Sequence, residues 1–258
     1  SNTIQVVNRY TLEHLTTISN GLSNPRYIAF TNGNAYVTNW GDGSNANDDY
    51  VAVVNLTSNT ITTSIPVTEG PERILGHNNK LYVAHMGGYG FGNSISVIQA
   101  NDNTVSSIEV GDVPNSLVLL NNDLYVLCGG KPSWAESETS GSFVKINLST
   151  NTVTSALPFL LGNHPSNLVL HENKFYYTVN SDVFSKTIEA NTIPLTPLFS
   201  TSPQGVYGVY SFAIANNKIY VGDAADYNSN GKVYIYSLTG TLENQQTVGV
   251  IPGGFYFN

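Results

Sequence analysis

The stretch GPERILGHNNKLYVAH, residues 70–85, recurs in modified form four more times along the 258 residues of the chain. The other copies begin at positions 24, 113, 164 and 208 and read NPRYIAFTNGNAYVTN, VPNSLVLLNNDLYVLC, HPSNLVLHENKFYYTV and GVYSFAIANNKIYVGD. Successive copies start 46, 43, 51 and 44 residues apart. A repeat of this length indicates one supersecondary unit used several times. The repeat therefore decides the architecture.

Each copy predicts two strands joined by a tight turn. In residues 70–85 the runs RILGH and LYVAH flank an Asn-Asn pair, and Asn and Gly are the residues that accept the positive φ of a hairpin turn. A second half follows each copy, such as DYVAVVNLTSNTITTSIPV at 49–67, where alternating apolar residues indicate two more half-buried strands. The pattern predicts an all-β fold, a β-propeller of four-stranded antiparallel blades that forms a single domain over residues 1–258.

Composition narrows the classes of partner. Hydrophobic residues make up 41% of the chain, charged residues only 11%, and the formal net charge is −8. A negative chain with few Lys and Arg residues lacks the basic track that phosphate backbones need, which disfavours nucleic acid and anionic membranes as partners. No apolar run is long enough to span a bilayer.

The two ends predict an incomplete ring. Residues 1–18 read as a second half without a first half, and PGGFYFN at 252–258 reads as an innermost strand with nothing after it. Propellers usually close by sharing one blade between the two ends. The chain thus supplies five full blades and parts of two. We expect either six blades with one strand short, or a larger ring whose leading segment of roughly 65 to 75 residues is separate from this chain.

The motif YVTN at 36–39, echoed as YVAH and YVGD, resembles the YVTN-type propellers that include YncE-like proteins. Within that group NPRYIAF, GPERI, VGDVPNSL and the terminal PGGFYFN are similar to surface lipoproteins of the DUF5074 type. The resemblance covers nearly the whole chain and implies seven blades, a lipid-anchored N-terminus in the separate segment, and a place on the extracellular face of the outer membrane. It also implies capture of a cobamide (vitamin B12) for a TonB-dependent transporter.

Strand directions place the long connections on one face, opposite the turns at Asn79 and Asn122. These connections are residues 40–48, 86–93, 129–142 and 223–231, and long loops on one face of a rigid scaffold are the usual place for binding. We expect a ligand platform built from the aromatic residues of these loops and of one crossing between blades: Trp40, Tyr89, Phe91, Trp134, Tyr207, Tyr210 and Tyr227. The alternative is that these rings only anchor the loops.

Three polar residues complete the candidate ligand-binding set. Arg26 and Arg73 begin the innermost strands of their blades, where they either donate to a ligand phosphate or amide, or bind backbone carbonyls or Glu72. His85 ends a second strand, and we expect it at the mouth of the central channel, where it is either a ligand contact or a hydrogen-bonded structural residue.

Metal and catalytic signals are weak. Asp226, Asn228 and Asn230 match the opening of a calcium loop, but its twelfth position is Ser237, and an Asx-rich turn explains the same residues. No catalytic motif is present, so we expect no cofactor and no enzyme. The leading hypothesis is a cell-surface propeller that captures a bulky small molecule. The alternatives are a protein-docking module of an outer-membrane complex and, less favoured, a propeller hydrolase or lactonase.

Overall fold

A computed structural model describes residues 2–257 and contains five four-stranded antiparallel sheets and one two-stranded sheet. Each sheet is a meander in chain order, and we number the four-stranded sheets blades 1 to 5. Blade 1 holds β3 (Pro25–Thr31), β4 (Asn34–Asn39), β5 (Tyr50–Asn55) and β6 (Thr60–Pro66). Blade 2 holds β7 (Pro71–His77), β8 (Lys80–His85), β9 (Ser94–Gln99) and β10 (Val105–Glu109).

The remaining strands continue the pattern. Blade 3 holds β11 (Pro114–Leu120), β12 (Asp123–Cys128), β13 (Ser142–Asn147) and β14 (Thr152–Pro158). Blade 4 holds β15 (Ser166–His171), β16 (Lys174–Val179), β17 (Asp182–Thr187) and the two-residue β18 (Phe199–Ser200), followed by a 3-10 turn at Ser202–Gln204. Blade 5 holds β19 (Ser211–Ala215), β20 (Lys218–Asp223), β21 (Lys232–Ser237) and β22 (Leu242–Thr247), and the two-stranded sheet pairs β1 (Ile4–Val7) with β2 (His14–Ile18).

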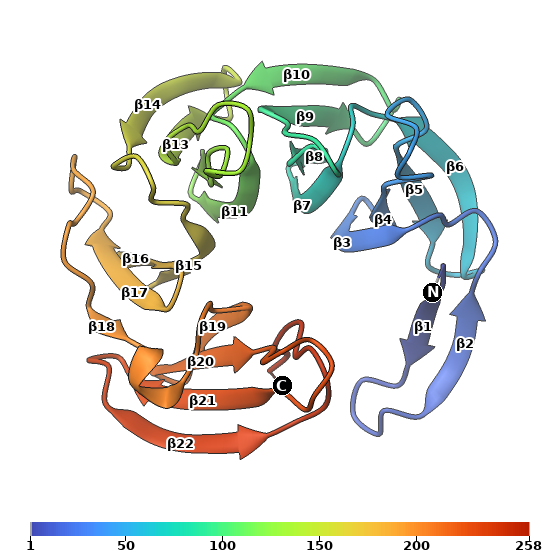
Figure 1. Cartoon of the computed structure of the whole chain (residues 1–258). Coiled ribbons are helices and arrows are strands. Elements are labelled where there is room, and N and C mark those ends of the chain that lie inside the picture. Colours follow the sequence, from blue (N-terminus) through green and yellow to red (C-terminus); the bar gives the residue numbers. More distant parts are fainter. Residues whose placement is uncertain (1, 258) are drawn as a thin grey trace.

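The sheets lie side by side around a central axis, with the first strand of each blade innermost (Figure 1). The all-β propeller predicted from the repeat is confirmed, and each blade begins one to three residues after the start of its copy of the repeat. Tight turns explain why the first two strands of each blade pair. At Asn32 and Gly33 φ is 49° and 73°, and at Asn78 and Asn79 it is 49° and 58°, the conformation in which a two-residue turn matches the strand twist.

The hydrophobic core is divided among the spaces between neighbouring blades. One cluster joins Tyr36 and Val51 of blade 1 to Leu81 and Val83 of blade 2, and similar clusters fill each of the next three interfaces. A further cluster packs the two-stranded sheet against blade 1 through Ile18 and its neighbours. Because both faces of a blade pack on neighbours, the second strands are buried along almost their whole length.

Polar clasps link neighbouring blades near the axis. Thr38 Oγ1 donates to the Glu72 carbonyl at 2.9 Å, Asn115 Nδ2 to that of Pro165 at 2.9 Å, and Asn167 Nδ2 to that of Val209 at 3.1 Å. Each clasp connects one blade to the start of the next blade's innermost strand. These clasps link blade 1 to blade 2, blade 3 to blade 4 and blade 4 to blade 5.

The C-terminal segment continues this series. Ser211 Oγ donates to the Pro252 carbonyl at 2.6 Å, and the Tyr220 ring lies 5.8 Å from Phe255 and 4.9 Å from Phe257. Residues 252–257 therefore lie beside blade 5, but they form no strand, so the innermost strand predicted there is absent from the described structure. No second strand within residues 2–257 pairs with them. Asn258, the last residue of the predicted strand, lies outside the described residues.

The ring of described residues is open. β1 pairs only with β2, and Figure 1 shows an opening between this sheet and blade 5. Neighbouring blades contact each other through side chains. Packing against another blade therefore supplies no hydrogen-bond partners for the backbone of the β1 edge or of residues 252–257. The separate segment expected to complete the ring, and the count of seven blades, stay predictions.

Candidate functional site

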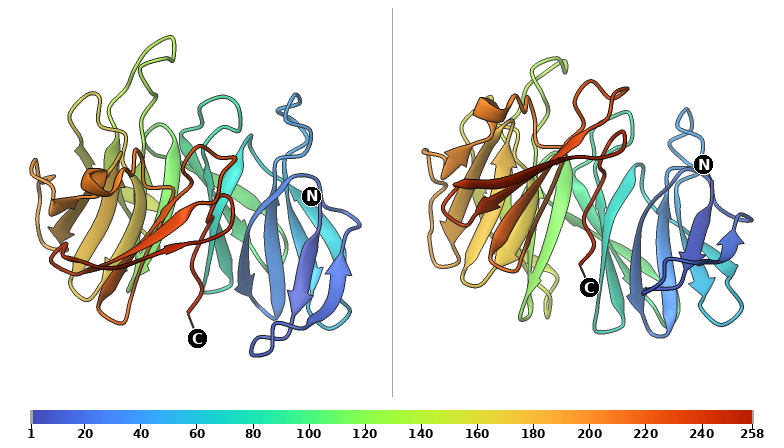
Figure 2. Two further views of the ribbon diagram at one scale, coloured as in Figure 1. Left: turned by 60° about the horizontal axis from the view of Figure 1, so that its bottom comes forward. Right: turned by 90° about the horizontal axis from the view of Figure 1, so that it is seen from below.

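The long loops share one face of the ring. In both views of Figure 2 the connections that follow β4, β8, β12 and β20 project from one side, and the hairpin turns within the blades project from the other. Blade 4 lacks such a loop because β16 and β17 are joined by a two-residue turn. We call this side the loop face. The predicted strand directions are thus confirmed.

Aromatic rings meet in pairs on the loop face. Trp40 and Tyr89 lie edge to face with 6.1 Å between their centroids, and Tyr210 and Tyr227 lie edge to face at 5.8 Å. Phe91 and Trp134 lie tilted to each other at 5.5 Å. Tyr89, Trp134 and Tyr207 are 78%, 77% and 97% exposed. The structure therefore brings six of the seven predicted aromatics together two by two, while Tyr207 projects alone into solvent.

Trp40 is the most firmly held of these rings. Its Nε1–H donates to the Pro71 carbonyl at 3.1 Å, and the guanidinium of Arg26 lies 4.2 Å from its centroid. The hydrogen bond ties the first loop to blade 2, and Arg26 holds the ring from blade 1. For Trp40 the packing interpretation is therefore correct, whereas Tyr89 beside it keeps an open surface.

Arg26 is neutralised within the protein. Its Nε and Nη2 donate to the two carboxylate oxygens of Glu72 at 2.8 and 3.0 Å, and Glu72 is buried. This two-point bond raises the pKa of Arg26. Of the two alternatives raised by the sequence, the bond to Glu72 is the correct one for Arg26.

Arg73 differs from Arg26 although it occupies a similar place in the next blade. Its guanidinium lies 4.0 Å from the ring centroid of Tyr27, and within residues 2–257 no carboxylate forms an ion pair with it. The donors of Arg73 are thus available to a ligand.

A small cavity lies beside Arg73 at the centre of the ring. It encloses about 160 Å³ and takes its walls from blades 1 to 4: Tyr27, Glu72, Arg73, Met86, Asn115, Ser166 and Asn167. Sequence reasoning missed Tyr27, Asn115 and Asn167. The signal that identifies them is their place one or two positions after the first residue of each repeated innermost strand, the strand that borders the axis.

His85 does not lie at the channel mouth, and that expectation is wrong. Its side chain is fully buried, with Nε2 2.8 Å from Ser96 Oγ and Nδ1 3.3 Å from the Glu69 carbonyl. Burial lowers the pKa of His85 to about 4. The equivalent Asn39, Cys128 and Val179 are buried too, because the second strand lies between two inter-blade cores and only the first strand borders the axis.

The Asp226 loop is organised by its own hydrogen bonds. The carboxylate of Asp226 accepts from the backbone N–H groups of Asn228 at 3.0 Å and Ser229 at 2.6 Å, and these bonds lower the pKa of Asp226. Asx-turn chemistry therefore explains the residues that resemble the start of a calcium loop. Within the described part of the chain, no three His, Cys, Asp or Glu side chains are placed to share a metal ion.

Comparisons with known proteins agree on the architecture. The solved structures that this chain resembles are β-propellers. The fold is a β-propeller. The chain is similar to hydrazine synthase of Kuenenia stuttgartiensis, with a TM-score of 0.73 and 17% identity over 98% of this chain and 82% of that one. It is also similar to BamB of Moraxella catarrhalis, with a TM-score of 0.62 and 11% identity over 100% of this chain and 71% of that one.

A third similar structure is a quinonprotein alcohol dehydrogenase-like protein of Bacteroides thetaiotaomicron. Its TM-score is 0.66, with 13% identity over 95% of this chain and 60% of that one. Identities this low show a shared fold alone. No protein-family model and no curated protein matches the propeller, so the resemblance to YVTN-type surface lipoproteins stays a prediction. Among residues 2–257 no helix has the length and apolarity needed to cross a membrane.

Proposed function

We propose that this propeller is a binding module that captures a bulky small molecule on its loop face. The observation that carries the proposal is Arg73, whose donors are unpaired beside a central cavity within a face rich in exposed aromatic rings. Flat aromatic side chains supply contact area at low cost in conformational entropy, and Arg supplies directed donors to phosphate or amide oxygens. A ligand that spans both features would be large, partly apolar and equipped with oxygen acceptors.

A cobamide is the specific candidate, and it rests on the family resemblance of the repeats. On the same basis we place the module on the extracellular face of the outer membrane, anchored by lipid through a separate N-terminal segment, with a TonB-dependent transporter as the recipient. The proposal is for binding without catalysis.

Protein docking is the second candidate, and one observation favours it. Tyr89, Trp134 and Tyr207 stand out from the face instead of converging on one cavity. Exposed aromatic anchors of this kind are enriched among the residues that dominate protein–protein binding.

Calorimetric titration of the chain with cyanocobalamin tests the first proposal. We expect saturable binding that weakens at least tenfold in Arg73→Gln and in Trp134→Ala. Phe30→Ser is the matched control, because Phe30 is an exposed ring in the half of β3 near the opposite face. Absence of binding by the folded parent chain would exclude a cobamide. Equal binding by all the variants would show that the loop face is not the site.

A further inference from the structure

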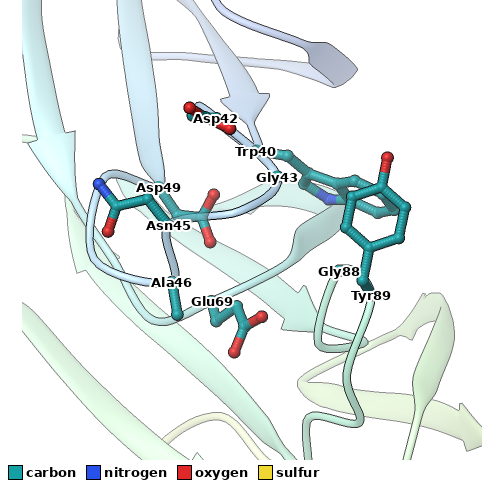
Figure 3. Close-up of a pocket in the computed structure, with 9 residues that line it drawn as sticks. All are labelled: Trp40, Asp42, Gly43, Asn45, Ala46, Asp49, Glu69, Gly88 and Tyr89. Atoms are coloured by element: carbon teal, nitrogen blue, oxygen red, sulfur yellow. The ribbon is translucent and has the colours of Figure 1, made fainter.

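A narrow pocket lies between the first loop of blade 1 and the start of blade 2. Figure 3 shows the residues that line it: Trp40, Asp42, Gly43, Asn45, Ala46, Asp49, Glu69, Gly88 and Tyr89. Asp49 and Glu69 both line this pocket, with the Glu69 carboxylate on the side of Gly88, and the rings of Trp40 and Tyr89 close one side. None of these acidic residues belongs to the set predicted from the sequence.

Asp49 is the central acceptor of this pocket. It is 3% exposed, and its Oδ2 accepts from the Gly70 N–H at 2.8 Å. Its Oδ1 is buried and has no hydrogen-bond partner among residues 2–257. A buried carboxylate oxygen without a donor costs free energy, so this atom identifies a place where a donor fits.

The negative charge around Asp49 is uncompensated. Asp48 and Glu69 both act on the Asp49 carboxylate, and burial together with these neighbours raises its pKa to about 6. Within residues 2–257 none of the three forms a salt bridge with Lys, Arg or His. Arg26 lies over the Trp40 ring but is bound to Glu72. The pocket therefore favours a positive group from outside.

Size and lining decide which positive group fits. The enclosed space is about 10 Å³, close to the room that a single water needs, so it accepts one small head group and no more. Calcium needs six to eight oxygen ligands, whereas no three acidic, His or Cys side chains of the described chain are placed to share a metal. The aromatic wall supplies no oxygen ligands but does attract organic cations.

We propose that this pocket binds a primary ammonium group. Asp49 Oδ1 and the Glu69 carboxylate accept its N–H donors, while Trp40 and Tyr89 pack against the carbon atoms attached to the nitrogen. A free alkylamine and the side chain of a lysine in a partner protein present the same chemistry. The proposal does not depend on capture of a bulky ligand, because the pocket and the cavity beside Arg73 share no lining residue.

Tryptophan fluorescence tests the proposal directly. The chain has two tryptophans, so Trp134→Phe leaves Trp40 in the pocket wall as the only one. We expect n-butylammonium chloride to change this signal saturably, and sodium chloride and tetramethylammonium, which has no N–H donor, to leave it unchanged. Binding should weaken at least tenfold in Asp49→Asn and in Glu69→Gln.

The matched control is Asp226→Asn, which removes an acid from another loop of the same face and should leave the affinity unchanged. A parallel titration with Nα-acetyl-lysine methylamide separates the two sources. Tighter binding than n-butylammonium assigns the pocket to a partner lysine, and equal or weaker binding assigns it to free amines. Saturation by calcium chloride without competition from n-butylammonium would replace the ammonium site with a metal site. No response to any amine in the folded Trp134→Phe protein would show that the pocket holds water only.

Discussion

The carboxylate of Asp49 and the imidazole of His85 bind opposite ends of one peptide unit, the unit that joins Glu69 to Gly70. Asp49 Oδ2 accepts from its N–H at 2.8 Å, and His85 Nδ1 lies 3.3 Å from its carbonyl oxygen. Because a carbonyl only accepts, Nδ1 carries the proton and Nε2 accepts from Ser96 Oγ. A neutral imidazole and a carboxylate thus fix the crossing from blade 1 to blade 2.

Replacement of Asp49 by Asn should stabilise the protein above pH 6. The folded-state pKa of Asp49 is raised from 3.8 to about 6, so its contribution to stability is present below pH 3.8 and is lost as the pH rises through 6. Because solvent at the loop screens part of this effect, the ionised Asp49 carboxylate lowers the free energy of unfolding by on the order of 1–2 kcal/mol at pH 7.5. Urea unfolding of both proteins should show this gain at pH 7.5 and little difference at pH 3.5. A gain of the same size at both pH values would contradict it.

His85 should have the opposite pH dependence. Its folded-state pKa is lowered from 6.5 to about 4, so its contribution is complete above pH 6.5 and is lost as the pH falls through 4. The contribution of His85 to the free energy of unfolding that is lost in acid is on the order of 2–3 kcal/mol. His85→Asn, which copies the residue at the equivalent Asn39, should be less stable than the parent at pH 7.5 and lose less stability between pH 7 and pH 4. An unchanged acid profile would assign acid sensitivity to other groups.

Glu72 and Arg73 are neighbours in β7 with separable roles. Glu72→Gln leaves Arg26 without its two-point partner and should lower the free energy of unfolding by about 1–2 kcal/mol. Arg73→Gln breaks no ion pair and removes only the contact with the Tyr27 ring, so it should lower stability by less than about 1 kcal/mol. Chemical denaturation measures both variants. A larger loss for Arg73→Gln than for Glu72→Gln would reverse the roles assigned here.

Gly70 is required for two reasons. Its φ is +65°, and a Cβ there would collide with the main chain of Gly87 and Gly88. Gly70→Ala should therefore cost about 3 kcal/mol or more. Gly33→Ala is the control, because φ is +73° but no atom lies within 4 Å of its Cβ, so only the backbone term of about 1–2 kcal/mol remains. Equal thermal unfolding temperatures for the two variants would show that the main chain around Gly70 shifts to accommodate the added Cβ.

Tyr177 and Tyr234 test the value of a buried hydroxyl. The Tyr177 hydroxyl is buried without a partner, whereas that of Tyr234 donates to the Gln204 carbonyl at 3.0 Å. Tyr177→Phe should leave stability unchanged or raise it by about 1 kcal/mol, and Tyr234→Phe should lower it by about 1 kcal/mol. Calorimetric unfolding of the two variants and of the parent protein measures both changes. Destabilisation by Tyr177→Phe would indicate a bound water at that hydroxyl.

The fold was predictable because the repeat, the Asn-rich turns and the period-two strands all indicate one unit. The loop face followed from strand direction, which places Trp40 and Tyr227 on the same side. His85 could not be placed, because alternation does not say that the second strand has buried faces on both sides. Nor does the sequence separate Arg26 from Arg73. Which arginine pairs with Glu72 depends on how blades 1 and 2 pack against each other, and the spacing of residues along the chain does not give that packing.

The pocket at Asp49 shows another limit. Asp48, Asp49 and Glu69 lie in two segments of the chain, and only the folded crossing brings them together. A cluster of acids in a polar loop is ordinary in sequence. What distinguishes it is that two carboxylate oxygens, Oδ1 of Asp48 and Oδ1 of Asp49, are buried without a hydrogen-bond partner among the described residues.

The clasps from Thr38, Asn115 and Asn167 join blade 1 to blade 2, blade 3 to blade 4 and blade 4 to blade 5, and Ser211 binds the C-terminal segment. The sheets of the described residues therefore form an arc with two ends. In such a system opening begins at the ends and propagates inward, and amide protons of blades 2 to 4 should exchange more slowly than those of β1 and β2. Any molecule that bridges the opening would convert the arc into a circle. Every blade would then have two neighbours, and none could open without breaking both interfaces.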